Sequence, residues 1–231
     1  MTSVNTDVLD YAGFAYPVEG LGPGAKRIVI WVRGCGRGCA GCIAPELHAS
    51  GEPTTLDAIV EELRPFLAEA DGLTISGGEP FAQVGALCAL IDRLRAIRRG
   101  LEVLIYTGYV HEQLLKTGGP TALLERADIL IDGSYRHELP NTLRWRGSDN
   151  QRVLLLSKHA QRYAKQANLP WPEPRTLQVQ ALDTELYRII GIPRRGDLKA
   201  FERAMAARGW KMVRAAVEEK PDIVTYDDED E

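Results

Sequence analysis

Three cysteines with short spacing are the residues of this sequence that most directly indicate chemistry. Cys35, Cys39 and Cys42 form the pattern C-x3-C-x2-C, directly after an apolar run at 26–32. Thiolates are the usual ligands of iron–sulfur clusters, and glycines in such a loop let its backbone wrap a cubane. Three thiolates leave one of four irons without a protein ligand, and an open metal position is typical of catalytic sites. The loop, with glycines at 34, 36, 38 and 41, therefore predicts a catalytic four-iron, four-sulfur cluster.

A structural zinc site is the alternative for the same loop. Zinc takes four ligands, and His48 could supply the fourth. Structural zinc sites usually hold their ligands as two separated pairs, however, and the sequence has no second pair near this loop. The spacing therefore favours iron–sulfur over zinc, and a surface position is the simplest interpretation of His48. Cys88 differs, because it lies on the apolar face of a predicted helix, where a free cysteine packs as a small hydrophobe.

Composition excludes several classes of protein. The 231 residues suffice for one sizeable domain with a small addition, and 45% of them are hydrophobic. The net charge is only −4 and no basic run is present, so nucleic-acid binding is not expected. No apolar stretch approaches the roughly 20 residues of a membrane helix, and the first residues lack the apolar core of a secretory signal. A cytoplasmic protein without membrane contact is expected, in which clustered cysteines indicate metal rather than disulfides.

Apolar strands and amphipathic helices alternate along most of the chain. Strands are predicted at 26–32, 73–76, 102–108, 129–132 and 152–156. Helices are predicted from Thr55, with Thr54 and Asp57 as the start signal, and from Val84, followed by a weaker helical stretch broken at 118–120. Strands that are apolar throughout are typical of a parallel sheet covered by helices. An α/β fold is therefore expected, as a doubly wound sheet or a barrel.

The character of the sequence changes after residue 157. We expect a core domain at 1–157, a polar and proline-rich linker at 158–175, a small α+β appendage at 176–225 and an acidic disordered tail at 226–231. The appendage has two candidate strands at 176–182 and 186–192, a helix from Asp197 to near Gly209 and a further possible strand at 223–225.

A glycine pair follows the second predicted strand of the core. The segment Ser76-Gly77-Gly78-Glu79-Pro80 combines a flexible backbone with a carboxylate that could accept from a cationic group. Ligands of α/β proteins bind at the carboxyl ends of the strands. Because the cysteine loop follows the preceding strand, both segments are expected on the same rim of the sheet.

The cysteine pattern after a first strand, with GGEP after the second, resembles the radical SAM superfamily. The resemblance implies a partial (β/α)6 radical SAM barrel with the small C-terminal β-β-α appendage added to it. It also implies that the three cysteines hold a 4Fe-4S cluster. S-adenosylmethionine (SAM) would bind the open iron through its methionyl amine and carboxylate, and the segment Ser76, Gly77, Gly78, Glu79 and Pro80 would help to hold that amine. One electron from the reduced cluster would then split SAM, and the resulting 5′-deoxyadenosyl radical would abstract hydrogen from a substrate.

Further motifs resemble one group within this superfamily. Gly41 before the third cysteine, GPG at 22–24, YTGY at 106–109, LIDG at 130–133 and WRGSDNQRV at 145–153 are similar to the activating proteins of anaerobic ribonucleoside-triphosphate reductases. The resemblance covers about residues 14–157. It implies a protein partner, a glycyl radical enzyme, and an electron donor such as flavodoxin or ferredoxin.

The resemblance also extends the candidate site. Thr107, Gly108, Tyr109 and Asp132 are assigned to the cofactor rim by position. The motif members Arg144, Trp145, Arg146 and Asn150 receive no individual role, and no catalytic residue is expected beyond the cluster ligands.

The chain continues to residue 231, past the region of resemblance, and this leaves the substrate open. The alternatives are a modified peptide or a small molecule such as a pterin-derived precursor. A zinc-dependent binding module, with the appendage as its interaction surface, is a third possibility from another class of protein.

Overall fold

A central six-stranded sheet organises the protein. The computed structural model describes residues 6–116, 118–173, 175–181 and 187–210. The sheet has the strand order β2-β3-β5-β6-β7-β8, and two further pairs, β1 with β4 and β9 with β10, lie outside it. The strands are β1 Val8–Leu9, β2 Tyr11–Val18, β3 Arg27–Val32, β4 Thr54–Thr55, β5 Gly72–Gly77, β6 Val103–Tyr106, β7 Ile129–Asp132, β8 Arg152–Leu155, β9 Gln178–Ala181 and β10 Tyr187–Ile190.

Helices follow most strands of the core. The α-helices are α1 Leu56–Leu63, α2 Val84–Ile97, α3 His111–Lys116, α4 Thr121–Leu124 and α5 Asp197–Ala206. Short 3₁₀ turns lie at η1 Pro45–Leu47, η2 Arg64–Phe66, η3 Pro80–Ala82 and η4 Ala160–Tyr163. Within the described residues, none of these helices has the length and apolar character needed to cross a membrane.

Strands β3, β5, β6 and β7 are parallel, which confirms the α/β class. The two edge strands run the other way, because β2 is antiparallel to β3 and β8 is antiparallel to β7. The expectation of a parallel strand at 152–156 is therefore wrong. A parallel neighbour needs a crossover, usually through a helix, whereas the connection at 133–151 contains no helix and returns the chain beside β7.

The first edge strand, β2, is absent from the sequence-based expectation. Its sequence YAGFAYPV holds a glycine and a proline, both of which are depleted in strands. Its pairing with β3 is interrupted by register shifts between Tyr11 and Gly13 and between Ala15 and Val18. An edge strand tolerates both residues because one side of its backbone has no neighbour in the sheet.

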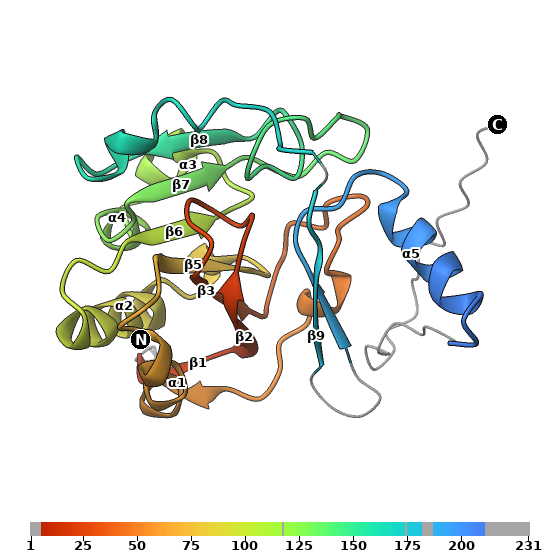
Figure 1. The fold of residues 1–231 in the computed structure, drawn as a ribbon. Coiled ribbons are helices and arrows are strands. Elements are labelled where there is room, and N and C mark those ends of the chain that lie inside the picture. Colours follow the sequence, from red (N-terminus) through yellow and green to blue (C-terminus); the bar gives the residue numbers. More distant parts are fainter. Residues whose placement is uncertain (1–5, 117, 174, 182–186, 211–231) are drawn as a thin grey trace.

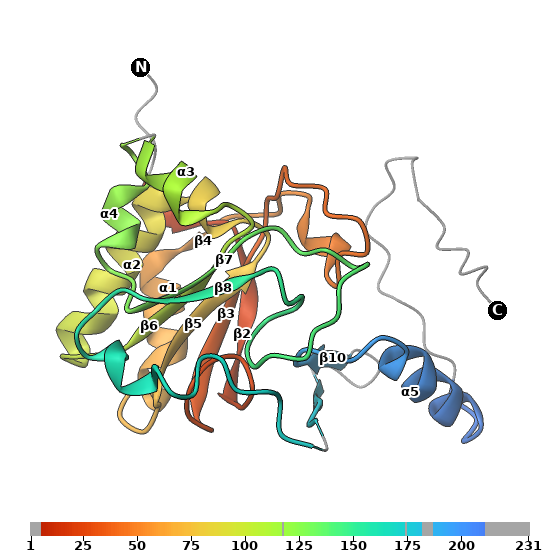
Figure 2. The same ribbon diagram turned by 90° about the horizontal axis from the view of Figure 1, so that it is seen from above.

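The two faces of the sheet have different covers. Helices α1 and α2 pack on one face, and the segments that follow β8 lie on the other (Figures 1 and 2). In β3, Ile28, Ile30 and Val32 join the core under the helices, whereas Val29 packs with a second cluster on the opposite face. Burial on both faces explains why the strands are apolar throughout.

Residues 158–173, the first part of the predicted linker, are packed rather than extended. Ala160 and Ala167 are buried against Ile129 and Ile131 of β7, together with Trp145. The polar composition of this segment does not indicate the packing, because the two residues buried against the sheet, Ala160 and Ala167, are small.

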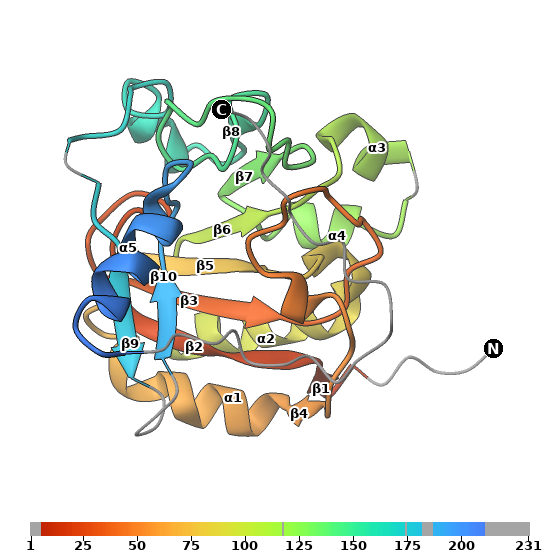
Figure 3. The same cartoon turned by 90° about the vertical axis from the view of Figure 1, so that its right-hand side faces the viewer.

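The predicted appendage elements are found in the described residues as β9, β10 and α5. Strands β9 and β10 form an antiparallel hairpin that lies beside β2 in Figure 3. Arg188 donates from its Nη1 to the Phe14 carbonyl (3.0 Å) and from its Nη2 to the Ala12 carbonyl (2.8 Å), and Gln178 donates to the Pro17 carbonyl (3.0 Å). The predicted strand at 223–225 and the acidic tail at 226–231 lie outside the described residues.

Helix α1 begins one residue later than its predicted start signal. Thr55, not Thr54, is the N-cap, and its side chain accepts from the Ala58 amide at 3.4 Å. Thr54 instead pairs with Leu9 in the short β1–β4 ladder. Either threonine could cap a helix, so sequence alone does not choose between them.

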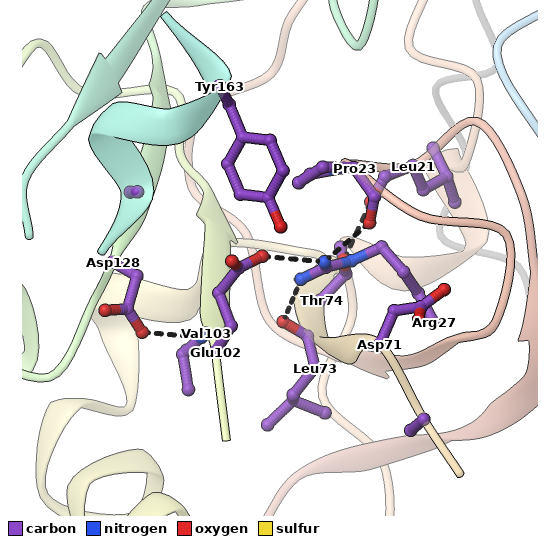
Figure 4. A network of polar contacts seen from close by, with 12 residues as sticks. Leu21, Pro23, Arg27, Asp71, Leu73, Thr74, Glu102, Val103, Asp128 and Tyr163 are labelled. Atoms are coloured by element: carbon purple, nitrogen blue, oxygen red, sulfur yellow. Dashed lines mark hydrogen bonds and ion pairs between the residues drawn. The ribbon is translucent and has the colours of Figure 1, made fainter. Parts of the chain in front are cut away.

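A fully buried arginine joins three strands at their amino ends (Figure 4). The Arg27 guanidinium donates to Thr74 Oγ1 (2.7 Å), Glu102 Oε1 (3.0 Å) and the carbonyls of Leu73 (2.8 Å) and Pro23 (2.9 Å). Burial lowers the pKa of Arg27, and the facing Glu102 carboxylate raises it again. The GPG motif makes room for this side chain, since a Cβ at Gly22 would lie 2.8 Å from the Arg27 Nε.

Replacing Arg27 tests how strongly this pair holds the fold. We expect Arg27→Met to lower the free energy of unfolding by about 3 kcal/mol, because the buried Glu102 carboxylate then keeps only the partly exposed Arg162, which donates to its Oε2 at 2.9 Å. Urea unfolding of the purified variant measures this value. Arg126→Ala is the matched control, since the Arg126–Asp92 pair is partly exposed and is worth about 1 kcal/mol. An equal loss in both variants would contradict the role given to Arg27.

Candidate functional site

The four parallel strands end at one rim of the sheet, and each is followed by a segment of the predicted site. The cysteine loop follows β3, the GGEP turn follows β5, residues 107–109 follow β6 and Gly133 follows β7. Figure 3 shows the loop after β3 at the arrowhead end of these strands. The structure therefore brings the sequence-predicted segments together, as the common strand direction requires.

Backbone contacts join the cysteine loop to the GGEP turn. The Gly78 amide donates to the Val32 carbonyl at 2.7 Å, and the Glu79 amide donates to the Gly34 carbonyl at 2.9 Å. A Cβ at Gly77, whose φ is +108°, would lie 2.4 Å from the Val32 carbonyl oxygen. A Cβ at Gly78 would lie 2.6 Å from the Gly34 carbonyl oxygen. Two glycines are needed here because the turn lies against the backbone of the cysteine loop.

The Glu79 carboxylate is buried and already bonded to the rim. Its Oε1 accepts from the Phe81 amide (3.0 Å) and from the Thr107 hydroxyl (2.8 Å), and its Oε2 accepts from the Gly108 amide (2.9 Å). Burial raises the pKa of Glu79, and these three donors together with the Arg37 charge act against that rise. The carboxylate therefore ties the turn after β5 to the turn after β6. Glu79, which was expected to accept a hydrogen bond from a ligand, thus also links two turns of the protein.

The three cysteines are free and partly exposed. The Cys35 amide donates to the His48 carbonyl at 3.0 Å, and the Cys42 amide donates to the Cys39 carbonyl at 3.2 Å. Burial raises the pKa of the Cys42 thiol most, and its proximity to Cys39 and Cys35 adds to the rise. The Cys42 thiol therefore lies close to Cys39 and Cys35, which suits a site that takes up all three as thiolates.

A glycine precedes the third cysteine because the chain is crowded there. Gly41 has φ +68°, and a Cβ at this position would lie 2.7 Å from the His137 Cβ. The loop after β7, which contains His137, therefore covers the cysteine loop at this point. An aromatic residue at position 41 would displace it.

The thiols suit a cluster better than a single metal ion. A cubane offers a separate iron to each thiolate, whereas zinc needs four ligands around one centre. Three neighbouring thiols on one glycine-rich loop therefore match the donor set of a 4Fe-4S cluster.

The remaining rim residues form a hydrogen-bonded layer. Thr107 is buried, and its Oγ1 also accepts from the Tyr109 amide at 3.1 Å. The Asp132 carboxylate accepts from the His111 amide at 2.8 Å and from the Arg152 Nε at 2.9 Å. Asp132 is thus already engaged in fixing the start of α3. Its assignment to the cofactor rim stays a prediction, as do those of Thr107, Gly108 and Tyr109.

The WRGSDNQRV motif anchors the loop after β7. The Trp145 carbonyl accepts from the Tyr106 hydroxyl at 2.8 Å, and Trp145 is buried with φ 64°. Asn150 donates to the Ser134 carbonyl (2.9 Å) and Gln151 donates to the Gly133 carbonyl (2.9 Å). Gln151 and Ser134 were not among the candidate residues, although Gln151 lies inside the motif.

The fourth cysteine lies away from this rim. Cys88 on α2 is partly buried and packs against the core under the helices, as its apolar helix face predicts. Burial raises the pKa of its thiol, so the neutral form is favoured there. Cys88 is therefore a natural control for the three cysteines of the loop.

Comparison with known proteins identifies the family. Residues 18–154 match a family described as a 4Fe-4S single cluster domain. The chain belongs to this family. The matched residues include Cys35, Cys39 and Cys42, and membership of this family favours a 4Fe-4S cluster over the zinc site considered as an alternative. A 4Fe-4S cluster and SAM are accordingly the cofactors of this radical SAM protein.

Curated relatives give the same result. The chain is 30% identical over 146 residues to the anaerobic ribonucleoside-triphosphate reductase-activating protein of Escherichia coli, a match that covers 60% of this chain and 94% of the relative. It is 31% identical over 144 residues to the protein of the same name from Vibrio cholerae, covering 59% and 92%. The resemblance found in the motifs is thus confirmed.

A solved structure, described as the crystal structure of QueE from Escherichia coli, is also similar. It is 19% identical, with a TM-score of 0.39, and the match covers 56% of this chain and 75% of that one. This likeness is too weak to support an argument.

The contact between Gly78 and the cysteine loop can be tested by adding one methyl group. We expect Gly78→Ala to reduce the iron bound per chain after anaerobic reconstitution, because its Cβ would displace the Gly34 carbonyl. Gly36→Ala is the control within the same loop, since nothing lies within 4 Å of a Cβ there. Iron analysis and visible absorption measure the loading. Equal loading in the two variants would show that the close approach is not required.

Proposed function

We propose that this radical SAM enzyme activates a partner glycyl radical enzyme by abstracting hydrogen from one of its glycines. The observation that supports this most is the direct bonding of the cysteine loop to the GGEP turn. This bonding supports a cluster site beside the segment expected to hold SAM. The relatives are named for activating an anaerobic ribonucleoside-triphosphate reductase, and we propose a reductase of this class as the partner.

The residues of the rim divide into ligands and supports. Cys35, Cys39 and Cys42 would each bind one iron of the cluster. When bound, the cluster supplies the electron that splits SAM into methionine and a 5′-deoxyadenosyl radical. Ser76–Pro80 would bind the methionyl part of SAM, with Glu79 fixing the shape of that turn. Thr107, Gly108, Tyr109 and Asp132 would complete the rim around it.

We propose that the fold is a partial (β/α)6 barrel with a small C-terminal appendage. The four parallel strands and their helices would correspond to the shared part of such a barrel, with the antiparallel strands β2 and β8 at its borders. The domain limits follow the sequence expectation, with a core at 1–157, a connecting segment at 158–175, an appendage at 176–225 and a tail at 226–231. Ala160 and Ala167 of the connecting segment pack on the sheet, so this segment lies against the core.

A short barrel leaves one side free for a large substrate. We propose that a loop of the partner enters there, and that a small redox protein such as flavodoxin or ferredoxin supplies the electron. The appendage lies outside the region shared with the relatives, which covers 60% of this chain. It is therefore the part that would adapt this chain to its own partner.

The activity is tested without oxygen, with reconstituted protein, reductant, SAM and the candidate reductase. We expect 5′-deoxyadenosine together with a glycyl radical on the reductase, because the same hydrogen atom links the two. Chromatography detects the nucleoside, and electron paramagnetic resonance detects the radical. Formation of 5′-deoxyadenosine without a glycyl radical would favour a peptide or small-molecule substrate. Absence of both products would contradict radical chemistry.

The cysteine assignment is tested by single substitutions. We expect Cys35→Ala, Cys39→Ala and Cys42→Ala each to abolish SAM cleavage, because each removes one ligand of the cluster. Cys88→Ala is the control: it should retain SAM cleavage while lowering stability slightly, since it removes only a partly buried side chain. Cleavage measured by 5′-deoxyadenosine release that persists in all three loop variants would refute the assignment.

A further inference from the structure

An arginine inside the cysteine loop connects that loop to two neighbouring strands. Arg37 lies between the first and second cysteines, and its side chain contacts residues that follow β6 and β7. Its Nη2 donates to Ser134 Oγ at 2.5 Å, and Ser134 Oγ in turn donates to the Gly108 carbonyl at 3.0 Å. Its guanidinium carbon lies 4.5 Å from the centre of the Tyr109 ring. One side chain thus contacts the segments that follow two strands.

The YTGY motif provides space for this contact. A Cβ at Gly108 would lie 2.8 Å from the Arg37 Nε and 3.3 Å from its Cγ and Cδ, so a larger residue would push the side chain away. Tyr109 provides the aromatic face for the cation, and the ring quadrupole attracts the guanidinium charge. Gly108 and Tyr109, which were assigned to the cofactor rim by their position in the sequence, therefore also contact the Arg37 side chain.

The charge of Arg37 also acts on the rim. It favours the ionised form of the buried Glu79 carboxylate, which holds the turns after β5 and β6 together. Within the described part of the chain, the Arg37 Nε is buried without a hydrogen-bond partner. Because an unpartnered charged donor is costly to bury, the contacts with Ser134 and Tyr109 must compensate for keeping it there.

We propose that Arg37 is a positioning residue that holds the cysteine loop against the ends of β6 and β7 before the cluster is bound. Three thiolates on a mobile loop would each lose conformational freedom on binding iron, and a loop that is already held loses less. The role rests on the proposed cluster ligands. It assigns to Arg37 no contact with the cluster or with SAM.

The test is amide hydrogen exchange on the cluster-free full chain. We expect Arg37→Ala to speed exchange at the Cys35 and Cys42 amides by roughly fivefold to thirtyfold, the effect of losing one or two kcal/mol of local stability. Arg136→Ala is the matched control, because Arg136 lies on the loop after β7 and pairs with the half-exposed Glu138 on the surface. It should leave exchange at the two cysteine amides unchanged.

Ser134→Ala provides a milder second variant. It removes the hydroxyl that accepts from Arg37 while leaving the arginine in place, so we expect a smaller increase in exchange at the same amides. In the double variant the increase should match that of Arg37→Ala alone, because the two side chains act through one contact. Additive effects would mean that Ser134 and Arg37 act separately, and wild-type exchange rates in Arg37→Ala would overturn the proposal.

Iron loading separates this proposal from the proposed function. Arg37→Ala should need a higher iron and sulfide concentration to reach the visible absorption of the wild type, and should reach the same final absorption. A wild-type protein that binds no cluster would refute the proposed function, yet the exchange measurement would still decide the role of Arg37. Loading of Arg37→Ala at wild-type concentrations, together with faster exchange, would refute the link between loop order and cluster uptake.

Discussion

The buried guanidinium of Arg27 is the interaction on which the arrangement of the sheet depends. From the start of β3 it bonds to the adjacent strand β5, through Thr74 and the Leu73 carbonyl, and to Glu102, which precedes the next strand in the sheet, β6. Pairing then runs without a break from Arg27 opposite Gly72 to Val32 opposite Gly77. A shift of one residue would exchange the two faces of the strand and separate the cysteine loop from the GGEP turn. The anchor at one end of the sheet thus fixes the alignment at the other.

The rim of the site is built mostly from backbone groups. Carbonyls of Val32 and Gly34 accept from the GGEP turn, and the Glu79 carboxylate accepts from the Gly108 amide. Glycines occur at these points because neighbouring main chains touch there. The strand ends therefore set the main outline of the site, and the side chains of Glu79 and Arg37 link the segments that follow them.

Much of this could be predicted from the sequence, because parallel strands with both faces buried leave uniform apolar runs. The strands at 26–32 and 129–132 and the common rim follow from that pattern. The edge strand β2 does not follow from it, because Gly13 and Pro17 are atypical of strands. The direction of β8 does not follow from it either, because it depends on a long connection without a helix. The roles of Glu79 and Asp132 as internal links could not be predicted either. The sequence around such a carboxylate does not show whether the side chain accepts hydrogen bonds from a ligand or from the protein itself.

The hairpin of β9 and β10 changes what the sheet offers to other molecules. Strand β2 lies at the end of the strand order, and its outward carbonyls at Ala12 and Phe14 are capped by Arg188. An uncovered edge of this kind is a template on which a second polypeptide can add a strand, including another copy of the same chain. By covering the β2 edge, the hairpin disfavours the addition of a strand there. At this edge, a partner would therefore be recognised through side chains and loops instead of by extending the sheet.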